Sequence, residues 1–244
     1  MDYELRTWSS LRALGEPAYR SLCREDTSPF LSYEWLDALE CTGCVSAERG
    51  WVPLHLTLHQ NDELVAFAPA YLKGNSEGEF VFDHSWARFS EASLGSPYYP
   101  KLVVAVPFTP ATGSRLLVRP GHDVPTLLPV MAAALRRLTS ELGVSSAHVL
   151  FPTEAEAGAL VSGGLARRLG VQFQWQNAGY TCFDDFLSRF NAKRRHQIRR
   201  ERREAMAQGV DIEILTGRDL TPAIADFVHA FYAVTVDKFF WGRR

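Results

Sequence analysis

The chain has few of the features that mark membrane proteins or secreted proteins. No run of about eighteen consecutive apolar residues occurs, so we expect no membrane span. The first ten residues, MDYELRTWSS, are acidic and polar, which argues against a secretory signal peptide. Four cysteines in 244 residues are too few for a disulfide-rich fold, so we expect a cytoplasmic protein with reduced thiols.

Residues that bind metals are also scarce. Cys41 and Cys44 have the spacing of a zinc knuckle or redox pair, but no second pair accompanies them and they end an expected helix. The seven histidines form no HxxxH pair on an expected helix, since His55 and His59 lie on an expected strand. We therefore predict no metal site.

The chain does contain the apolar residues of a packed protein, 46% hydrophobic and 12% aromatic, in a mixed α/β pattern. Residues 52–59 alternate with a period of two and precede a turn at Asn61–Asp62 and an apolar run at 64–72, which predicts a β-hairpin. Residues 124–142 carry apolar residues on one helical face. With expected strands at 115–119 and 145–151, that helix predicts a βαβ unit of two parallel strands.

The remaining expectations complete this α/β (α+β, mixed-sheet) fold. Further strands are expected at 3–8, 79–83, 102–106, 172–181 and 211–215, and further helices at 10–24, 32–42 and 221–241 and from 154 to about 164 or 170. The segment 86–113 is aromatic and proline-rich, so we expect an irregular loop there. Such a loop either lines a site or packs for structural reasons alone.

Residues 183–209 are predicted to form one long basic helix. From Lys193 to Glu204 the segment has seven Lys or Arg residues and two Glu residues, in a chain whose net charge is −2. Like charges three and four residues apart repel one another on a helix. We therefore infer that a phosphate-bearing ligand or polyanion binds there, and the alternative is a solvent-exposed face that only aids solubility.

Several sequence blocks resemble those of a known family. The blocks are FLSYEWLDALE, GWVPLHLTL, YYPKLVVAVPFTPATGSRLL, SSAHVLFP, FDDFLSRFNAKRRHQIRRERR and FYAVTVDKFFWG. Together they resemble the Fem-type (FemAB-like) branch of the GNAT acyltransferase superfamily, in the subgroup of peptidoglycan biosynthesis or recognition proteins, over nearly the whole chain. The resemblance implies a GNAT-like domain at 1–168 and the start of a second one, containing the basic helix, at 169–244.

The resemblance also has consequences at the end of the chain. Members of the subgroup continue beyond the Trp-Gly pair, whereas Trp241–Gly242 is followed here by two residues, so we expect the second domain to be truncated. Apolar residues on the last expected helix would then lack a covering layer. We therefore expect a homo-oligomer in which that C-terminal helix forms the contact and its apolar residues are covered.

The activity implied by the resemblance is acyl transfer. Fem-type proteins move an aminoacyl group, usually from an aminoacyl-tRNA, onto an amine of a cell-wall precursor, and they use no metal. No Ser-His-Asp or Cys-His nucleophile motif is visible, so we expect direct attack by the amine in a ternary complex and assign no catalytic residue. The alternatives are a precursor-recognition protein without catalysis, a CoA-dependent N-acetyltransferase, and a nucleic-acid-binding module that uses the basic helix.

The loop that would bind the pyrophosphate of acetyl-CoA is residues 119–123, at the start of an expected helix. It has one glycine, and Asp123 would repel a phosphate. We therefore predict no cofactor, with acyl-CoA kept as an alternative donor.

Eight residues are predicted to bind an anionic substrate or precursor. In the first part of the chain these are Tyr98, Tyr99, Lys101 and Arg115, where the alternative for the two cations is a plain surface charge. In the second part the resemblance implies Lys193, Arg194, Arg199 and Arg200, which match the basic motif of the family's second module. We interpret His148, on an expected strand beside the first group, as a hydrogen-bonded core residue.

Overall fold

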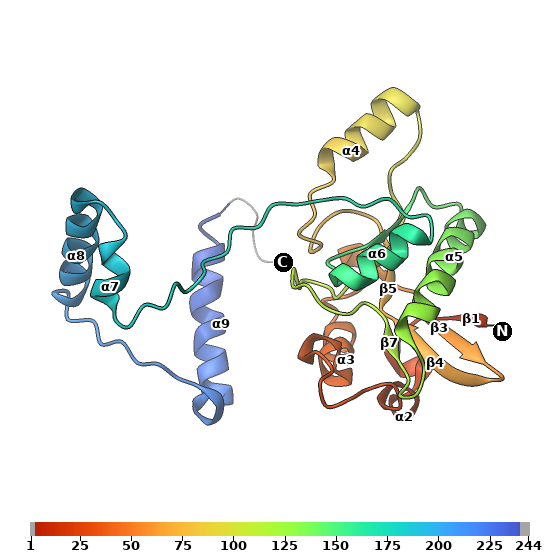
Figure 1. The fold of residues 1–244 in the computed structure, drawn as a ribbon, viewed down its shortest axis with the longest axis horizontal. Helices are drawn as coiled ribbons and strands as arrows, with labels where there is room; N and C mark the ends of the chain where they lie inside the picture. Colours follow the sequence, from red (N-terminus) through yellow and green to blue (C-terminus); the bar gives the residue numbers. More distant parts are fainter. Residues whose placement is uncertain (1–2, 240–244) are drawn as a thin grey trace. The chain divides into compact units, whose positions relative to one another are not determined.

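The computed structural model describes residues 3–239 and divides after Gly170 into two compact units, which are described separately (Figure 1). The first unit is built on two four-stranded sheets. One has the order β1 (Glu4–Trp8), β3 (His55–Gln60), β4 (Glu63–Ala68) and β7 (Leu117–Val118), and the other has the order β2 (Trp51–Pro53), β5 (Ala70–Lys73), β6 (Lys101–Val104) and β8 (Ala147–Val149).

The two sheets are continuous through hydrogen bonds at Pro69. The amide of Leu54, between β2 and β3, donates to the carbonyl of Ala70 at 2.9 Å, and the amide of Ala105 donates to the carbonyl of Pro69 at 3.0 Å. Pro69 has no N–H group to donate, so the ladder is interrupted at this residue. The result is one bent sheet whose halves meet between β4 and β5.

Helices cover both faces of this sheet. Successive residues of a strand point to opposite faces, and accordingly Ala66 and Ala68 of β4 pack with α5 (Val124–Leu142) in one core. Phe67 packs instead with α1 (Leu11–Leu14), α2 (Glu16–Arg20) and α3 (Tyr33–Cys41) in another. The helix α6 (Glu154–Ser162) lies beside α5.

Several local predictions are confirmed. The hairpin of β3 and β4 turns at Asn61 and Asp62, which have φ of 51° and 64°. The helix α5 has the predicted bounds and ends at Gly143. The alternation over 52–59 does not separate a buried face from an exposed one, because the sheet has helices on both faces, and His55, Thr57 and His59 are buried as well as Leu56 and Leu58.

The predicted parallel pairing of strands 115–119 and 145–151 is wrong. The strand β7 pairs antiparallel with β4, and β8 pairs parallel with β6, with Leu102 opposite Ala147. The segment between β6 and β7 moves the chain from one half of the sheet to the other. The helix α5 therefore connects β7 and β8 across the bend and leaves them unpaired.

Two other predictions in the first unit are corrected. Residues 79–83 form a loop and no strand. The segment 86–113 contains helix after all, because α4 (His84–Phe89) continues into a π-helical turn, η3 (Ser90–Leu94). The prolines of this segment lie at 97, 100, 107 and 110, beyond the helical residues, so none of them interrupts the helix. Three short 3₁₀ turns are η1 (Pro29–Leu31), η2 (Ala47–Arg49) and, in the second unit, η4 (Gly217–Asp219).

The second unit consists of α7 (Phe183–Ser188), α8 (Ala192–Met206) and α9 (Pro222–Val236). The prediction of one helix over 183–209 is wrong, because Asn191 starts a new helix and its side chain accepts the amide of Arg194 at 2.9 Å. The strands expected at 172–181 and 211–215 are absent, and no residue among 171–239 lies in a strand. The expected end of the last helix, 240–241, lies outside the described residues. That 169–244 begins a second GNAT-like domain stays a prediction.

Candidate functional site

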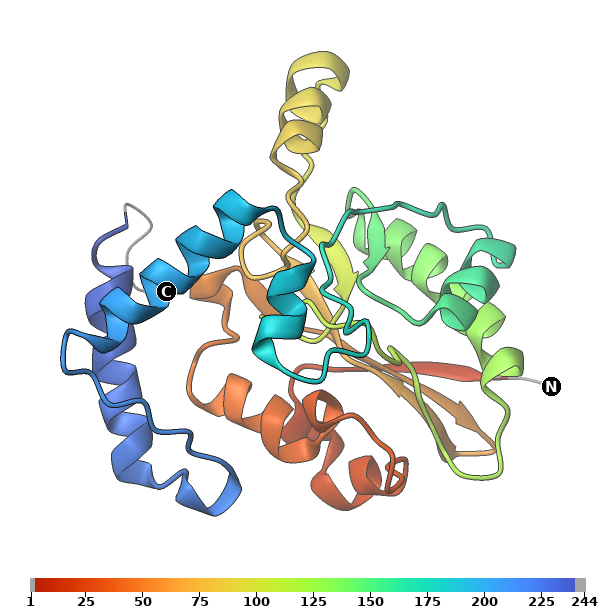
Figure 2. The same cartoon turned by 60° about the vertical axis from the view of Figure 1, so that its left-hand side comes forward.

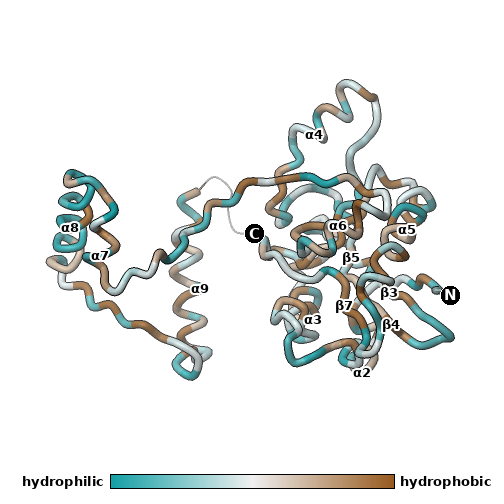
Figure 3. The backbone as a smooth tube through the Cα atoms, viewed as in Figure 1, coloured by the Kyte–Doolittle hydropathy of each residue, from teal (hydrophilic) through white to brown (hydrophobic). Residues whose placement is uncertain are grey.

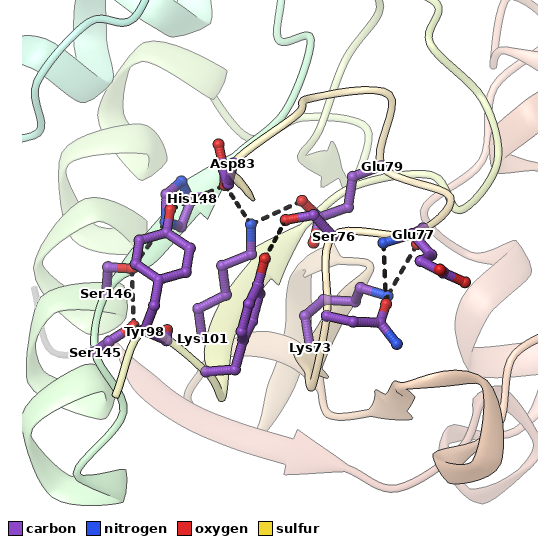
Figure 4. Close-up of polar contacts among 12 residues, drawn as sticks. Lys73, Ser76, Glu77, Glu79, Asp83, Tyr98, Lys101, Ser145, Ser146 and His148 are labelled. Atoms are coloured by element: carbon purple, nitrogen blue, oxygen red, sulfur yellow. Dashed lines mark hydrogen bonds and ion pairs between the residues drawn. The ribbon is translucent and has the colours of Figure 1, made fainter. Parts of the chain in front are cut away.

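Lys101, the first residue of β6, lies at the centre of a buried cluster of charged side chains (Figure 4). Its Nζ donates to Glu79 Oε2 at 2.7 Å and to Asp83 Oδ2 at 2.6 Å, and all three side chains are fully buried. Pairing of this kind offsets the cost of removing a charge from water. The alternative of a plain surface charge is therefore wrong for Lys101.

Asp83 joins three parts of the first unit. Besides Lys101, its carboxylate accepts the Tyr98 hydroxyl at 2.9 Å and a guanidinium N–H of Arg168. Burial by itself would raise the pKa of Asp83, but the hydrogen bonds from Lys101 and Arg168 outweigh it and hold the pKa below its ordinary value. Asp83 is therefore a stable anion that fixes the loop 74–83 to the start of β6.

Glu79 is the less satisfied carboxylate of the cluster. Burial raises its pKa, and the charge and hydrogen bond of Lys101 offset this only in part. Its Oε1 is buried and has no hydrogen-bond partner among the described residues. Glu79 thus differs from Asp83, since it lies in a setting that favours the neutral acid.

Lys73, at the end of β5, is a second fully buried lysine. Its Nζ donates to Asn75 Oδ1 at 3.2 Å and to the Glu77 carbonyl at 3.1 Å, and it lies 3.8 Å from the centre of the Trp51 ring. Burial lowers the pKa of Lys73 to about 7, with the charge of Glu79 acting in the opposite direction. The charge of this region therefore changes close to neutral pH.

The other polar groups of the cluster are engaged by neighbours. Tyr99 is hydrogen-bonded to Ser76 at 2.6 Å, so both predicted tyrosines contact the ends of loop 74–83. His148 is half-buried and hydrogen-bonded through Nε2 to Ser146 at 2.8 Å, as expected for a core histidine. Burial lowers the pKa of His148 to about 4, so its ring is neutral at pH 7.

Arg115 lies apart from Lys101, near the opposite end of the paired strands β6 and β8. Its guanidinium donates to the carbonyls of Leu150 and Ala111 at 2.6 Å each, and to those of Ser114 and Gly113 at 3.0 and 3.2 Å. Only 5% of Arg115 is exposed, so a plain surface charge is wrong here too. The side chain ties the loop before β7 to the end of β8. Contact of Tyr98, Tyr99, Lys101 or Arg115 with a substrate stays a prediction.

The start of α5 is occupied by a carboxylate of the protein itself. Asp123 caps this helix, and its Oδ2 accepts the amide of Thr126 at 3.1 Å and the Thr126 hydroxyl at 2.7 Å. The first turn of a helix binds anions through free amide groups. The Asp123 carboxylate already accepts one of these amide groups and would repel a bound anion.

The basic helix α8 has two distinct sides (Figure 3 shows its hydrophilic character). One side faces α7: Arg199 pairs with Asp184 at 2.7 Å, and the Arg202 guanidinium lies 4.1 Å from the centre of the Phe183 ring. Arg195 donates to the Phe190 carbonyl at 2.5 Å on the same side. These arginines hold α7 and α8 together.

The other side of α8 points away from α7. Lys193 and Arg200 are seven residues apart, which places them on one stripe of the helix, whereas Arg203, four residues after Arg199, lies between this stripe and the side that faces α7; all three are exposed. Arg200 pairs with Glu204 at 3.5 Å, whereas Lys193, Arg194 and Arg203 have no carboxylate within 4.0 Å in the described part of the chain. Of the four predicted cations on α8, Arg199 and Arg200 are thus paired and Lys193 and Arg194 are not. Whether any of them binds a ligand stays a prediction.

The carboxylates and the second lysine of the cluster were not predicted from the sequence. A signal for them exists, because Lys73 and Lys101 are single charges that adjoin apolar strand residues in AYLK and KLVV. A lysine buried in a sheet needs nearby carboxylates. Glu79 and Asp83 stand in the aromatic segment EFVFD between these two strands.

Residues 3–239 contain neither a metal-binding cluster nor a membrane-spanning helix. No group of three or more His, Cys, Asp or Glu residues there is arranged to hold a metal ion. No helix in the same range is long and apolar enough to cross a membrane.

Comparisons with known proteins give a family and a similar solved structure. The family FemAB_like, described as peptidoglycan biosynthesis/recognition, matches residues 6–244. The structure of AAC(6')-Iy in complex with the bisubstrate analogue CoA-S-monomethyl-acetylneamine is similar at a TM-score of 0.42 and 13% identity, covering 73% of this chain and 100% of that one. No curated protein matches the chain.

Proposed function

The chain belongs to the FemAB-like family of peptidoglycan biosynthesis and recognition, and on this premise we propose that it is an acyl- or aminoacyl-transferase. In this proposal the acceptor is an amine of a peptidoglycan precursor, which attacks the acyl donor directly in a ternary complex. Direct attack avoids a covalent enzyme intermediate and needs donor and acceptor to be held together.

The observation that carries the proposal is the unpaired positive charge on the outer stripe of α8. Residues 183–206 contain eight Lys or Arg residues and four Asp or Glu residues, and only two of the cations on α8 form ion pairs within the described chain. A pyrophosphate group, such as peptidoglycan precursors carry, would neutralise Lys193 and Arg194 at the start of α8, whereas Arg203 lies about 15 Å further along the helix and would need another phosphate. The stripe is therefore the proposed anchor for the precursor.

The start of α5 supports a donor other than a CoA thioester. Asp123 already accepts the Thr126 amide, so a pyrophosphate at this turn would meet a carboxylate and one fewer free amide. An aminoacyl-tRNA is the donor that we propose, and its phosphates would add to the demand for cations. We therefore favour the aminoacyl-transferase over the CoA-dependent N-acetyltransferase.

The first experiment measures binding of a soluble uridine-diphosphate-linked muramyl peptide at several salt concentrations. We expect the variant K193A/R194A/R203A to bind more weakly, and its affinity to fall less steeply with rising salt concentration than that of the wild type, because fewer charge pairs are left for salt to screen. The matched control is R195A/R202A, which removes two arginines of the side facing α7 and should leave the salt slope unchanged. Equal slopes in the wild type and the triple variant would contradict the phosphate anchor.

The second experiment separates a transferase from a precursor-recognition protein, which the family description also covers. The protein is incubated with the same precursor and a mixture of aminoacyl-tRNAs, and the precursor is examined by mass spectrometry. A mass increase of one aminoacyl residue supports transfer. Tight binding without a product would establish recognition instead.

A further inference from the structure

Aromatic side chains of the second unit form a continuous cluster around α7. The centre of the Phe186 ring lies 6.3 Å from that of Trp175 and 5.4 Å from that of Tyr180. The Phe190 ring, just before α8, is 5.1 Å from the Phe186 ring. In two views turned by 60°, α7 lies beside the start of α8 (Figures 1 and 2). The cluster therefore extends from the segment before α7 to the start of α8.

Trp175 contributes more to the surface than to the packing of this cluster. It is 67% exposed, whereas Phe186 and Phe190 are partly buried. The Tyr180 ring lies beside it, with ring centres 6.2 Å apart and planes inclined by 25°, so the two rings are stacked. The side chain of Asn177 accepts two amides of the following turn, at 3.0 Å each, and fixes this turn. An aromatic face left open in this way is a platform on which another flat ring can stack.

Unpaired cations follow directly after the ring cluster. Arg189 adjoins Phe190, and Lys193 and Arg194 come three and four residues after Phe190. All three cations are exposed, and none has a carboxylate within 4.0 Å among residues 3–239. Residues 171–183 carry no charge. An uncharged aromatic surface thus adjoins three cations that the described chain does not neutralise.

The acids of the same region are engaged by other groups. Asp184 pairs with Arg199 at 2.7 Å, and Asp185 Oδ2 accepts the amide of Thr181 at 3.1 Å. Both glutamates of α8 lie in its second half. The charge of Arg189, Lys193 and Arg194 is therefore available to a ligand.

We propose that this surface binds the nucleoside diphosphate part of a peptidoglycan precursor, with the base stacked on Trp175 and the phosphates held by Lys193 and Arg194. Aromatic side chains bind nucleobases by stacking, because every base has an aromatic face. Lys and Arg are the side chains that bind phosphate. The inference rests on the proposed function in taking a peptidoglycan precursor as the ligand.

The combination of rings and cations favours a nucleotide over other anions. A pyrophosphate linked only to a lipid offers the same charges but no ring that could stack on Trp175. A nucleic-acid strand carries a phosphate at every nucleotide and would use cations along the whole of α8. Arg199 and Arg200 are already paired, however, and Arg203 lies about 15 Å beyond Lys193. The free cations gathered beside the rings therefore match a single diphosphate.

This mode of binding has a consequence for the order of reactions. A base can anchor the precursor only while the nucleotide is still attached to it. The proposed aminoacyl transfer therefore precedes the reaction that separates the precursor from its nucleotide. A precursor that has lost the nucleotide should bind the chain more weakly.

The test is isothermal titration calorimetry of the full chain with uridine diphosphate and with inorganic pyrophosphate. Both probes carry the two phosphates, and only uridine diphosphate carries a base. We expect uridine diphosphate to bind about tenfold more tightly, which is within the range that one stacked base contributes. The variant W175A should remove this difference, so that both probes bind with the affinity of pyrophosphate.

The matched control is F231A in α9. Phe227 and Phe231 are 66% and 69% exposed, and their rings are stacked with centres 6.3 Å apart and planes inclined by 26°. No Lys or Arg lies in α9, so F231A should bind both probes as the wild type does. The variant R189A/K193A/R194A should weaken both probes to the same extent and leave the ratio of their affinities unchanged.

A second variant keeps the outcome clear if W175A misfolds. W175F keeps an aromatic ring, so uridine diphosphate should still bind it more tightly than pyrophosphate does. The quenching of tryptophan fluorescence by uridine diphosphate should be lost in W175F, and quenching that persists there contradicts stacking on Trp175. The proposal is overturned if the wild type binds both probes equally or if a folded W175A keeps the preference for uridine diphosphate. Tighter binding of an oligouridylate than of uridine diphosphate would also overturn it and assign the surface to RNA.

Neither probe contains an acceptor amine or an acyl donor, so the titrations are independent of transfer. A preference for uridine diphosphate that depends on Trp175, without any aminoacylated product, supports this inference and removes the transferase. Transfer by a protein that binds the two probes equally overturns this inference alone.

Discussion

Replacing Lys101 with methionine tests whether the buried cluster holds the first unit together. Methionine keeps most of the volume of lysine but leaves Glu79 and Asp83 buried without their shared cation. Removal of one partner from a buried ion pair costs about 3–5 kcal/mol, because the remaining charge is neither hydrated nor neutralised. Asp83 keeps Tyr98 and Arg168, so Glu79 bears most of this cost.

The stability lost in Lys101→Met is expected to depend on pH. Without Lys101, burial raises the folded-state pKa of Glu79 further above the unfolded value, so the neutral acid is preferred in the folded protein. A group with a raised folded pKa contributes stability below its unfolded pKa and loses it as the pH rises. The deficit of Lys101→Met should therefore be larger at pH 8 than at pH 5.

The assay is urea unfolding followed by circular dichroism at both pH values. The control K101M/E79Q/D83N removes the two negative charges together with the positive one, and it should recover part of the lost free energy of unfolding. A deficit below about 1 kcal/mol, independent of pH and equal in both variants, would refute the claim that these charges are buried and mutually dependent.

Three more predictions concern the same unit. Lys73 has a folded pKa of about 7, below the ordinary lysine pKa of 10.5, so wild-type stability should rise between these pH values by at most about 1.4 kcal/mol per unit, and Lys73→Met should abolish this rise in urea titrations. Gly78→Ala should lower the free energy of unfolding by about 2–4 kcal/mol in the same assay, because φ is 76° and the new Cβ would lie 2.5 Å from the Phe108 ring. Its control is Gly95→Ala, where φ is 63° but no atom lies within 4 Å of the new Cβ, and the loss should be about 1 kcal/mol. Arg115→Met leaves four carbonyls without its N–H groups and should increase proteolytic cleavage of the loop before β7, with a loss of about 2–3 kcal/mol.

Local signals in the sequence predicted the elements whose causes are local. Asn61–Asp62 specifies a hairpin turn by its backbone preference, and Asp123 and Gly143 bound α5 by capping. The partner of β8 could not be predicted in this way, because it depends on the bend at Pro69. The segments 172–181 and 211–215 alternate polar and apolar residues and have strand propensity, but no neighbouring strand is present among the described residues of that unit to accept their hydrogen bonds.

In the candidate site, too, some features follow from the local sequence and others depend on tertiary packing. The basic character of α8 follows from composition, but the separation of Arg199 from Lys193 depends on Asp184 of α7 and on the break at Asn191. The sequence predicts Lys101 as a cation that binds a substrate, whereas its burial depends on carboxylates contributed by a loop about twenty residues earlier. Such contacts between distant residues are set by tertiary packing, and a single sequence reports them only as an unexplained charge beside an apolar strand.

The bond between Asp83 and Tyr98 closes residues 84–97 into an excursion whose two ends meet. Because the ends are joined independently of what lies between them, the strands do not depend on the length or composition of the excursion. Natural variants could shorten, extend or exchange this segment while Lys101 and its carboxylates keep the neighbouring scaffold intact. The sequence of residues 84–97 could therefore change during evolution while the buried cluster around Lys101 stays the same.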